Sequence, residues 1–320
     1  MATGTRKYHV TTDNLKVIQK FYLDFTDNTA YVLQIPGGSQ TDMALTYGHF
    51  DPNSSEIDLK NGSHTTVNLN NFGHGQTFEV FKDTDGSKWA WVATYASPTQ
   101  TDSLGDHWAS RIGVIPLDGS ASIDASSVHS ITYLNYLGTG ATKNMSMHRV
   151  DAALSSDATR LAIWTQSSGS ASSATKRVTA LNAKPLFEAL KNGNINAKTN
   201  AGMVKGGKYY VSSRDISGYE YPQNSWQGME LSNRTSAGYN WVYLSSGQAA
   251  NNKTVLVRAP WNFTSPAPQS LTVSVPGVTG QHETEALQLH GDYVYFGVEE
   301  KISGGNNHYI YSIPKADFTN

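Results

Sequence analysis

Residues 76–95 read QTFEVFKDTDGSKWAWVATY, and this stretch decides the fold. An apolar run begins at Gln76, meets an acid at Glu79, turns through DTDGS and returns as a second run rich in tryptophan. Two such runs joined by a short Asp- and Gly-containing turn are typical of a β-hairpin. The candidate repeat is therefore a β-hairpin whose first strand begins with a polar residue and has an acidic residue three positions later.

The hairpin recurs along the whole chain. Strong copies are HRVDAALSSDATRLAIWTQ (148–166), QGMELSNRTSAGYNWVYLSS (227–246) and HETEALQLHGDYVYFGVE (282–299), and a weaker copy, QKFYLDFTDNTAYVLQI (19–35), has Tyr22 where the acid belongs. The copies stand roughly 55–80 residues apart, which leaves room for about four strands each, and radial repetition of four-stranded sheets is the propeller pattern. We predict an all-β fold, a five-bladed β-propeller of four-stranded antiparallel blades. It forms one domain over residues 1–320, with blades starting near residues 19, 76, 148, 227 and 282.

The segment KYHVTT (7–12) precedes the first copy and has no partner there. The last copy supplies three strands, so we expect residues 7–12 to complete the last blade and close the ring, which removes an open sheet edge. A helix-like stretch, AKPLFEALKNG (183–193), has Pro185 near its start and Gly193 after its end. It lies within the longest interval and is interpreted as an insertion.

Composition narrows the function. Charged residues make up 16% of the 320 residues and the formal net charge is −2, so no basic field is available to bind a nucleic acid. Cysteine is absent, which excludes disulfides and thiolate metal sites. The start shows no signal peptide, and no apolar run reaches the roughly 20 residues of a transmembrane segment. The 17 tyrosines and 7 tryptophans, with many amides and hydroxyls, suit either carbohydrate recognition or the ordinary aromatic content of strands.

Four segments carry a family resemblance: HGQTFEVF (74–81), MHRVDAALSSDATRLAI (147–163), NSWQGMEL (224–231) and QHETEALQL (281–289). In this order they resemble the helveticin J family of large class III bacteriocins from lactic acid bacteria. That family is similar to propeller domains of teichoic-acid biosynthesis proteins and of phage receptor-binding proteins. The resemblance implies a secreted or cell-surface antibacterial protein whose partner is a cell-wall glycopolymer or teichoic acid of Gram-positive bacteria. The first copy, with Tyr22, departs from the pattern.

Polar residues open each strong copy. The pairs are Gln76 with Glu79, His148 with Asp151, Gln227 with Glu230, and His282 with Glu285. The first strand of a blade lies innermost, so we expect these groups around the central channel. They could bind a cation, or they could form hydrogen bonds with backbone groups of their own and neighbouring blades. Positions i and i+3 face opposite sides of a regular strand, which argues against simple shared ligation of one cation. We predict no cofactor and leave a channel-bound cation open.

Aromatic residues in or beside loops form the second candidate set. Rings with neighbouring amides suit sugar recognition, and the alternative is a cluster that anchors loops. The predicted ligand-binding rings are Trp108, Tyr219, Tyr221, Trp226 and Trp261. No catalytic motif such as GxSxG or HExxH occurs, so we predict a binding protein and not an enzyme. The alternatives are a glycan or teichoic-acid hydrolase with channel carboxylates, and a non-lethal adhesin or lectin.

Overall fold

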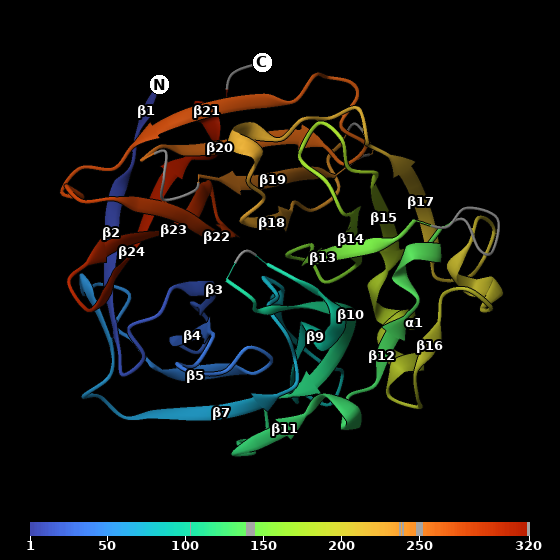
Figure 1. Cartoon of the computed structure of the whole chain (residues 1–320), viewed down its shortest axis with the longest axis horizontal. Helices are drawn as coiled ribbons and strands as arrows, with labels where there is room; N and C mark the ends of the chain where they lie inside the picture. The colour runs from blue at the N-terminus through green and yellow to red at the C-terminus, as the bar shows by residue number, and fades with distance from the viewer. Residues whose placement is uncertain (103, 139–144, 237, 239, 248–251, 319–320) are drawn as a thin grey trace.

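The computed structural model describes residues 1–318 except residues 103, 139–144, 237, 239 and 248–251. Strands dominate, and five sheets surround a central axis as blades (Figure 1). The fold is an all-β five-bladed propeller, as predicted from the hairpin repeat. Within the described residues there is one α-helix, α1 (Ala183–Leu190), at the position expected from the sequence.

The blades follow the chain in order, and each runs outward from its first strand. Blade I contains β3 (Ile18–Asp24), β4 (Thr29–Gln34), β5 (Met43–His49) and β7 (His64–Asn70). Blade II contains β8 (Phe78–Lys82), β9 (Lys88–Thr101), β10 (His107–Pro116) and β12 (Ser130–Thr132). Blade III contains β13 (Met147–Leu154), β14 (Arg160–Ser167), β15 (Lys176–Asn182) and β17 (Tyr210–Asp215). Blade IV contains β18 (Gly228–Leu231), β19 (Trp241–Ser246), β20 (Thr254–Pro260) and β21 (Gln269–Ser274). Blade V contains β22 (His282–His290), β23 (Tyr293–Ile302), β24 (Gly305–Pro314) and β2 (Thr5–Thr12).

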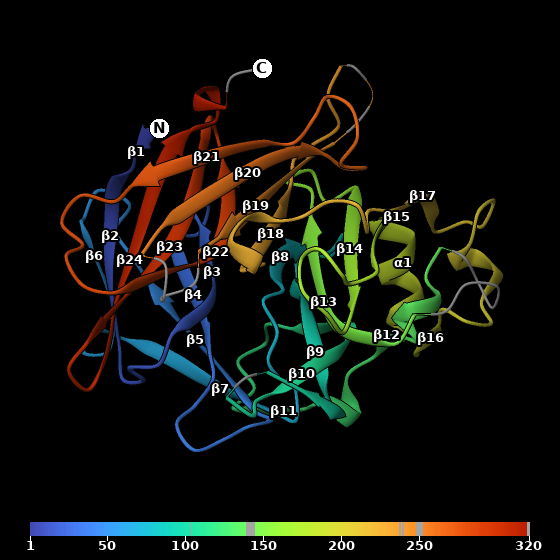
Figure 2. The ribbon, with the colours of Figure 1, turned by 45° about the horizontal axis from the view of Figure 1, so that its top comes forward.

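Residues 7–12 do complete the last blade. They belong to β2, which pairs antiparallel with β24, with His9 opposite Tyr309 and Val10 opposite His308. Figure 2 shows β2 lying beside β24, next to the blue strand β1.

Four blades carry a fifth strand, so the prediction of uniformly four-stranded blades needs correction. Each added strand is short, pairs parallel with the fourth strand of its blade, and comes from chain outside the consecutive run of that blade. We call these four the staple strands: β1 (Ala2–Thr3) on blade IV, β6 (Glu56–Leu59) on blade V, β11 (Ser122–Asp124) on blade I and β16 (Ile195–Asn196) on blade II. Each covers a sheet edge that would otherwise present unpaired backbone groups.

The apolar cores lie between blades. One contains Trp91 and Phe187 between blades II and III, and another contains Trp164 and Met229 between blades III and IV. Aromatic and branched side chains on the second strand of each hairpin therefore pack against the first strand of the next blade. With the apolar side chains packed between blades, the polar side chains at the start of each first strand lie toward the central axis.

Candidate functional site: the mouth of the central channel

A cavity of about 420 Å³ opens where the first strands of the blades begin. We call it the mouth. All five blades contribute to it: Lys16, Val17, Gln19, Ile35, Pro36, Gly38 and Ser39 from blade I; His74, Asp102, Leu104, Asp106 and Trp108 from blade II; Arg149 from blade III; Asn224, Ser225 and Gln227 from the start of blade IV; and Glu283 and Glu285 from blade V. A concave pocket with several convergent polar groups is the default place to look for a ligand site.

Gln76 ties the floor of the mouth together. Its amide Nε2 donates to Glu285 Oε2 at 2.9 Å and to Gln227 Oε1 at 3.2 Å, while its Oε1 accepts from Arg149 at 3.2 Å. Arg149 also donates to the backbone carbonyl of Trp226 at 2.8 Å. One amide side chain thereby joins blades II, III, IV and V, which fixes the positions of the groups that face the cavity.

His74 organises the side of the mouth formed by blades I and II. Its Nδ1 lies 2.9 Å from Asp102 Oδ2 and its Nε2 lies 2.6 Å from Gln19 Oε1. The ring stacks on Trp108 with 4.2 Å between centroids, and the Arg149 guanidinium lies 4.1 Å from the Trp108 ring centre. Trp108 is therefore 8% exposed, and its ring is held by neighbours on the mouth wall.

The carboxyl groups of the mouth are pushed in opposite directions. Burial works to raise the pKa of Asp102, but the hydrogen bond from His74 and the N–H groups of Leu104 and Asp106 outweigh it and lower that pKa. Burial and the charge of Asp102 raise the pKa of Asp106. Burial, with the neighbouring Glu283, raises the pKa of Glu285 well above its usual range. The mouth thus combines one carboxyl group whose pKa is lowered with two whose pKa values are raised.

One group of potential metal ligands lies here. Within the described part of the chain, ligand atoms of His74, Asp102 and Asp106 all lie within 4.8 Å of one another. Both ring nitrogens of His74 already lie within hydrogen-bonding distance of oxygen atoms, those of Asp102 and Gln19. These contacts fix the orientation of the imidazole. The predicted channel cation placed His148 and His282 among the carboxylates, and the structure does not bring those residues together. His148 Nδ1 lies 2.8 Å from Gln100 Oε1, and His282 Nδ1 lies 3.3 Å from the carbonyl of Gly280.

Below the mouth lies a buried ammonium group, that of Lys20, which was not predicted from the sequence; we call Lys20 and its partners the plug. Lys20 is 0% exposed, and its Nζ lies 2.6 Å from Glu230 Oε1 and 2.9 Å from Glu79 Oε1. It also donates to the Leu287 carbonyl at 2.9 Å. Burial opposes the charge on Lys20, but the two carboxylates more than compensate and raise its pKa, whereas burial and Glu230 raise the pKa of Glu79 well above its ordinary value.

The predicted polar pairs therefore divide by depth. Gln76 and Gln227 lie at the mouth, and the acids that follow three residues later, Glu79 and Glu230, lie at the plug formed by Lys20. Asp151 is buried beside the plug and accepts from Thr77 at 2.8 Å and from the Trp226 indole at 3.2 Å. Blade V differs: its register shifts between Glu285 and Leu287, where Ala286 has φ 50°, and Glu285 faces Gln76 at the mouth.

The predicted ligand-binding rings are mostly core residues. Trp226 is 0% exposed and stacks on Trp164 with 4.1 Å between centroids and 7° between planes. Tyr221 is buried and its hydroxyl donates to Gln166 Oε1 at 2.9 Å. Tyr219 and Trp261 pack against the same cluster. Of the five rings, Trp108 lines the mouth, and the other four form the loop-anchoring cluster that was the alternative interpretation.

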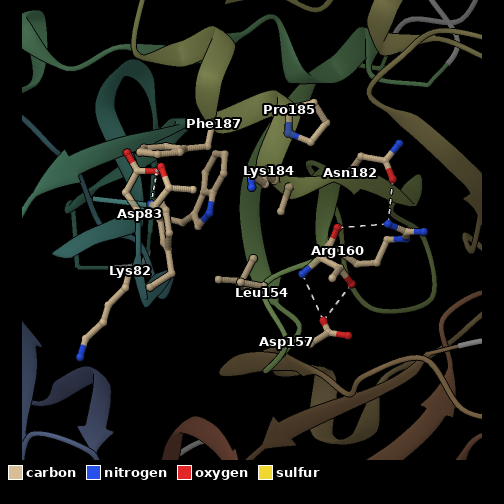
Figure 3. A pocket seen from close by; sticks show the side chains of 15 residues that line it. Lys82, Asp83, Leu154, Asp157, Arg160, Asn182, Lys184, Pro185 and Phe187 are labelled. Atoms are coloured by element: carbon tan, nitrogen blue, oxygen red, sulfur yellow. Dashed lines mark hydrogen bonds between the residues drawn. The ribbon is translucent and has the colours of Figure 1, made fainter. Parts of the chain in front are cut away.

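A second cavity, of about 510 Å³, lies between blades II and III at the opposite end of the first strands (Figure 3). Its floor is apolar, with Trp91, Leu154 and Phe187, and Lys82, Lys184 and Arg160 line its rim. Figure 3 shows Arg160 held to Asn182, a bond of 2.7 Å. Residues of two blades and α1 line this cavity, whereas residues of all five blades line the mouth.

The fold and the mouth define a propeller with a polar, five-sided channel entrance. The family model described as "Bacteriocin helveticin-J" matches residues 3–298. The chain therefore belongs to the helveticin J family, as the four segments indicated. No protein with a curated description matches it. Among the described residues, no helix has the length and apolarity needed to span a membrane.

Solved structures that share the fold include the following two. The tail fibre of Staphylococcus aureus phage P68 is 10% identical, with a TM-score of 0.62 over 98% of this chain and 53% of the fibre. The chain thus spans about half the length of that protein. An exo-β-1,3-galactanase from Phanerochaete chrysosporium is 11% identical, with a TM-score of 0.51 over 98% of this chain and 64% of the enzyme. At these identities the likeness concerns the fold.

The prediction that the chain is not an enzyme is overturned by this comparison. It rested on the absence of a linear catalytic motif, yet the galactanase is an enzyme on a similar propeller. In glycoside hydrolases the two working carboxyl groups are defined by their separation in space, which leaves no fixed sequence spacing. The absence of a linear catalytic motif therefore does not exclude catalysis.

Proposed function

We propose that the mouth binds a sugar-containing polymer of the Gram-positive cell envelope, and that the protein is an exported antibacterial protein acting through this binding. The observation that carries the proposal is the convergence of polar side chains from all five blades on one cavity of about 420 Å³. Hydroxyl, amide, guanidinium and carboxyl groups at fixed positions supply the donors and acceptors that a sugar ring requires. Membership of a bacteriocin family supports the antibacterial role.

A cavity-filling variant tests the binding step. Val17 lines the mouth and is partly exposed, so Val17→Trp should obstruct the cavity without disturbing the core. Val211, 40% exposed on the outer strand β17, gives the matched control Val211→Trp. Co-sedimentation with isolated walls should fall at least tenfold for Val17→Trp and stay at the wild-type level for the control, with similar melting temperatures. Wild-type binding by a folded Val17→Trp protein would remove the mouth from the proposal.

Two further measurements identify the polymer and the biological effect of binding it. Walls with and without extracted teichoic acid should be compared, since equal binding to both would exclude teichoic acid as the ligand. Growth inhibition of related lactobacilli that is lost on mild heating supports an antibacterial protein. Wall binding without inhibition supports the adhesin alternative.

A second candidate function is hydrolysis of the bound glycan, favoured by the opposed pKa shifts of the mouth carboxyls. A pair of carboxyl groups, one ionised and one protonated, is what general acid catalysis at a glycosidic bond requires. The hydrogen bond from His74 lowers the pKa of Asp102, and burial raises the pKa of Glu285, which accepts a hydrogen bond from Gln76. Release of reducing ends from walls, abolished in Glu285→Gln with wall binding retained, supports this function; no release by the wild type across pH 5–8 opposes it.

A further inference from the structure

The chain carries a local excess of positive charge that the mouth does not use. Residues 183–209 contain Lys184, Lys191, Lys198, Lys205 and Lys208 but a single acid, Glu188. This segment has a net charge of +4 in a chain of net charge −2, so the remaining residues carry −6. The segment includes α1 and the staple strand β16 and leads into β17, on the side of the ring occupied by blades II and III (Figure 1).

Three of these lysines lie along a continuous hollow surface. Lys184 lines both the 510 Å³ cavity and an adjoining one of about 590 Å³, and Lys208 lines that cavity and a third of about 640 Å³. Lys205 lines the third cavity with the Gly206–Gly207 turn. Since neighbouring cavities share residues, Lys184, Lys208 and Lys205 form one band, which we call the basic band. Arg160, in the first cavity, extends it.

The ammonium groups of the band are available to an external anion. By contrast, Lys191 is engaged within the protein, at 2.9 Å from Asp83 and 2.8 Å from Glu188. Lys184, Lys205 and Lys208 are exposed, and within the described residues none of them forms an ion pair, although Lys208 lies over the Tyr209 ring at 4.7 Å. The same hollows are also lined by Asp83, Asp157 and Glu188, of which Asp83 and Glu188 are paired with Lys191. The three exposed ammonium groups therefore favour an anionic ligand through charge complementarity.

We propose that the basic band binds a flexible polymer of phosphodiester-linked repeats, an anionic polymer of the cell envelope, at a site separate from the mouth. Point-charge ammonium groups suit phosphates on a mobile chain, for which no planar two-point geometry is needed. A single-stranded nucleic acid fits less well because its bases need exposed rings for stacking, and Tyr209 and Phe187 beside the band are each 3% exposed. The inference rests on the proposed wall binding and adds a second site, at which the ligand is recognised through its phosphates.

Two sites on one disc change how the protein would hold a wall. The first cavity of the band lies at the end of the first strands opposite the mouth, so a polymer must be long enough to reach both sites. For such a polymer, modest affinities at each site combine into stronger attachment. The band contributes the salt-sensitive part of that attachment, and the mouth contributes the salt-tolerant part.

The test uses a synthetic poly(glycerol phosphate) oligomer immobilised on a biosensor, with the full-length protein at 50–300 mM NaCl. Each ammonium–phosphate contact contributes about 0.7 to the slope of log K against log salt for a single-stranded polyelectrolyte, so three contacts contribute about 2. The Lys184→Gln/Lys205→Gln/Lys208→Gln variant should lose that slope and bind at least tenfold more weakly at 50 mM NaCl. The control Lys60→Gln/Lys253→Gln/Lys301→Gln makes the same charge change at exposed lysines elsewhere and should bind as the wild type does.

Three results would overturn the proposal. The first is equal loss in the band variant and the control, which reduces the effect to net charge. The second is loss of polymer binding in Val17→Trp but not in the band variant, which places the polymer at the mouth. The third is tighter binding of an oligodeoxynucleotide of equal charge, lost in the band variant, which makes nucleic acid the ligand. Retained polymer binding by Val17→Trp supports two separate sites, whatever the outcome for wall sugars.

Discussion

Replacing Lys20 with methionine should destabilise the propeller in a pH-dependent way. Lys20 Nζ has three buried oxygen partners, at 2.6, 2.9 and 2.9 Å, contributed by blades IV, II and V. Methionine fills a similar volume without charge, so the substitution leaves the carboxylates of Glu79 and Glu230 buried without a counter-charge. Removing one partner of a buried ion pair costs about 3–5 kcal/mol, which corresponds to a fall in melting temperature of roughly 4–7 °C for a chain of 320 residues.

The sign of the pH dependence follows from Glu79. Its pKa in the folded protein is raised well above the ordinary value, so the folded state takes up a proton that the unfolded state releases. Stability from such a group is present below the unfolded pKa and is lost as the pH rises through the folded pKa. Without the ammonium group the carboxyls can be buried cheaply only when protonated. The loss in Lys20→Met should therefore be smallest near pH 5 and largest near pH 8.

Urea denaturation at pH 5, 6, 7 and 8 measures this effect. Lys88→Met is the matched control, because Lys88 pairs with Asp24 and Asp27 at 3.0 and 2.6 Å but its side chain is 21% exposed; we expect a loss of about 1 kcal/mol or less. The double variant Lys20→Met/Glu230→Gln should recover part of the stability, since it removes one uncompensated carboxylate. A loss below about 1 kcal/mol at pH 8, or equal losses at pH 5 and pH 8, would refute the reasoning.

Two other predictions concern residues around the mouth. Trp226→Ala should cost about 3–5 kcal/mol of folding free energy, because it removes a fully buried ring stacked on Trp164. Trp226→Phe should cost less and lose mainly the hydrogen bond to Asp151. Thermal unfolding measures both variants, and an unchanged melting temperature with weakened wall binding would restore a ligand role to this ring. Gly73→Ala should destabilise by roughly 1–3 kcal/mol and weaken wall binding, because Gly73 has φ 77° and an added Cβ would lie 2.8–2.9 Å from backbone atoms of Ala96, Ala109 and His107, next to His74. Gly119→Ala, at φ 85° with open space around it, is the control for the backbone strain alone, and equal losses in the two variants would show that crowding at the mouth contributes nothing.

The hairpin repeat was sufficient to predict the propeller, because alternating apolar strands and polar turns are local properties of the chain. The closing of blade V by residues 7–12 also followed, since a strand without a neighbour in sequence needs an edge elsewhere. The staple strands could not be predicted. They are two to four residues long and pair parallel with distant strands, as when Ile131 pairs with Ile195, so no periodicity marks them.

The plug could have been found from charge balance. Four copies place an acid near the axis, and a ring of buried acids requires cations; the residues directly after the opening Gln or His include Lys20 and Arg149. The wall of the mouth could not have been found in this way. Asp102, Asp106 and His74 meet through loops whose course depends on the assembled blade. Trp226 was misread because it lies outside a strand in sequence, yet it becomes buried once Trp164 of the preceding blade covers it.

The staple strands set a limit on how this propeller can vary. β11 lies in the chain of blade II but completes blade I, and β16 lies in the chain of blade III but completes blade II. A contiguous segment exchanged by recombination would therefore remove a strand from one blade and bring an unmatched strand to another. Blades joined in this way cannot serve as interchangeable cassettes. Diversification is instead expected by point changes and length changes in loops, such as those that carry Val17, Leu104 and the lysines of the basic band.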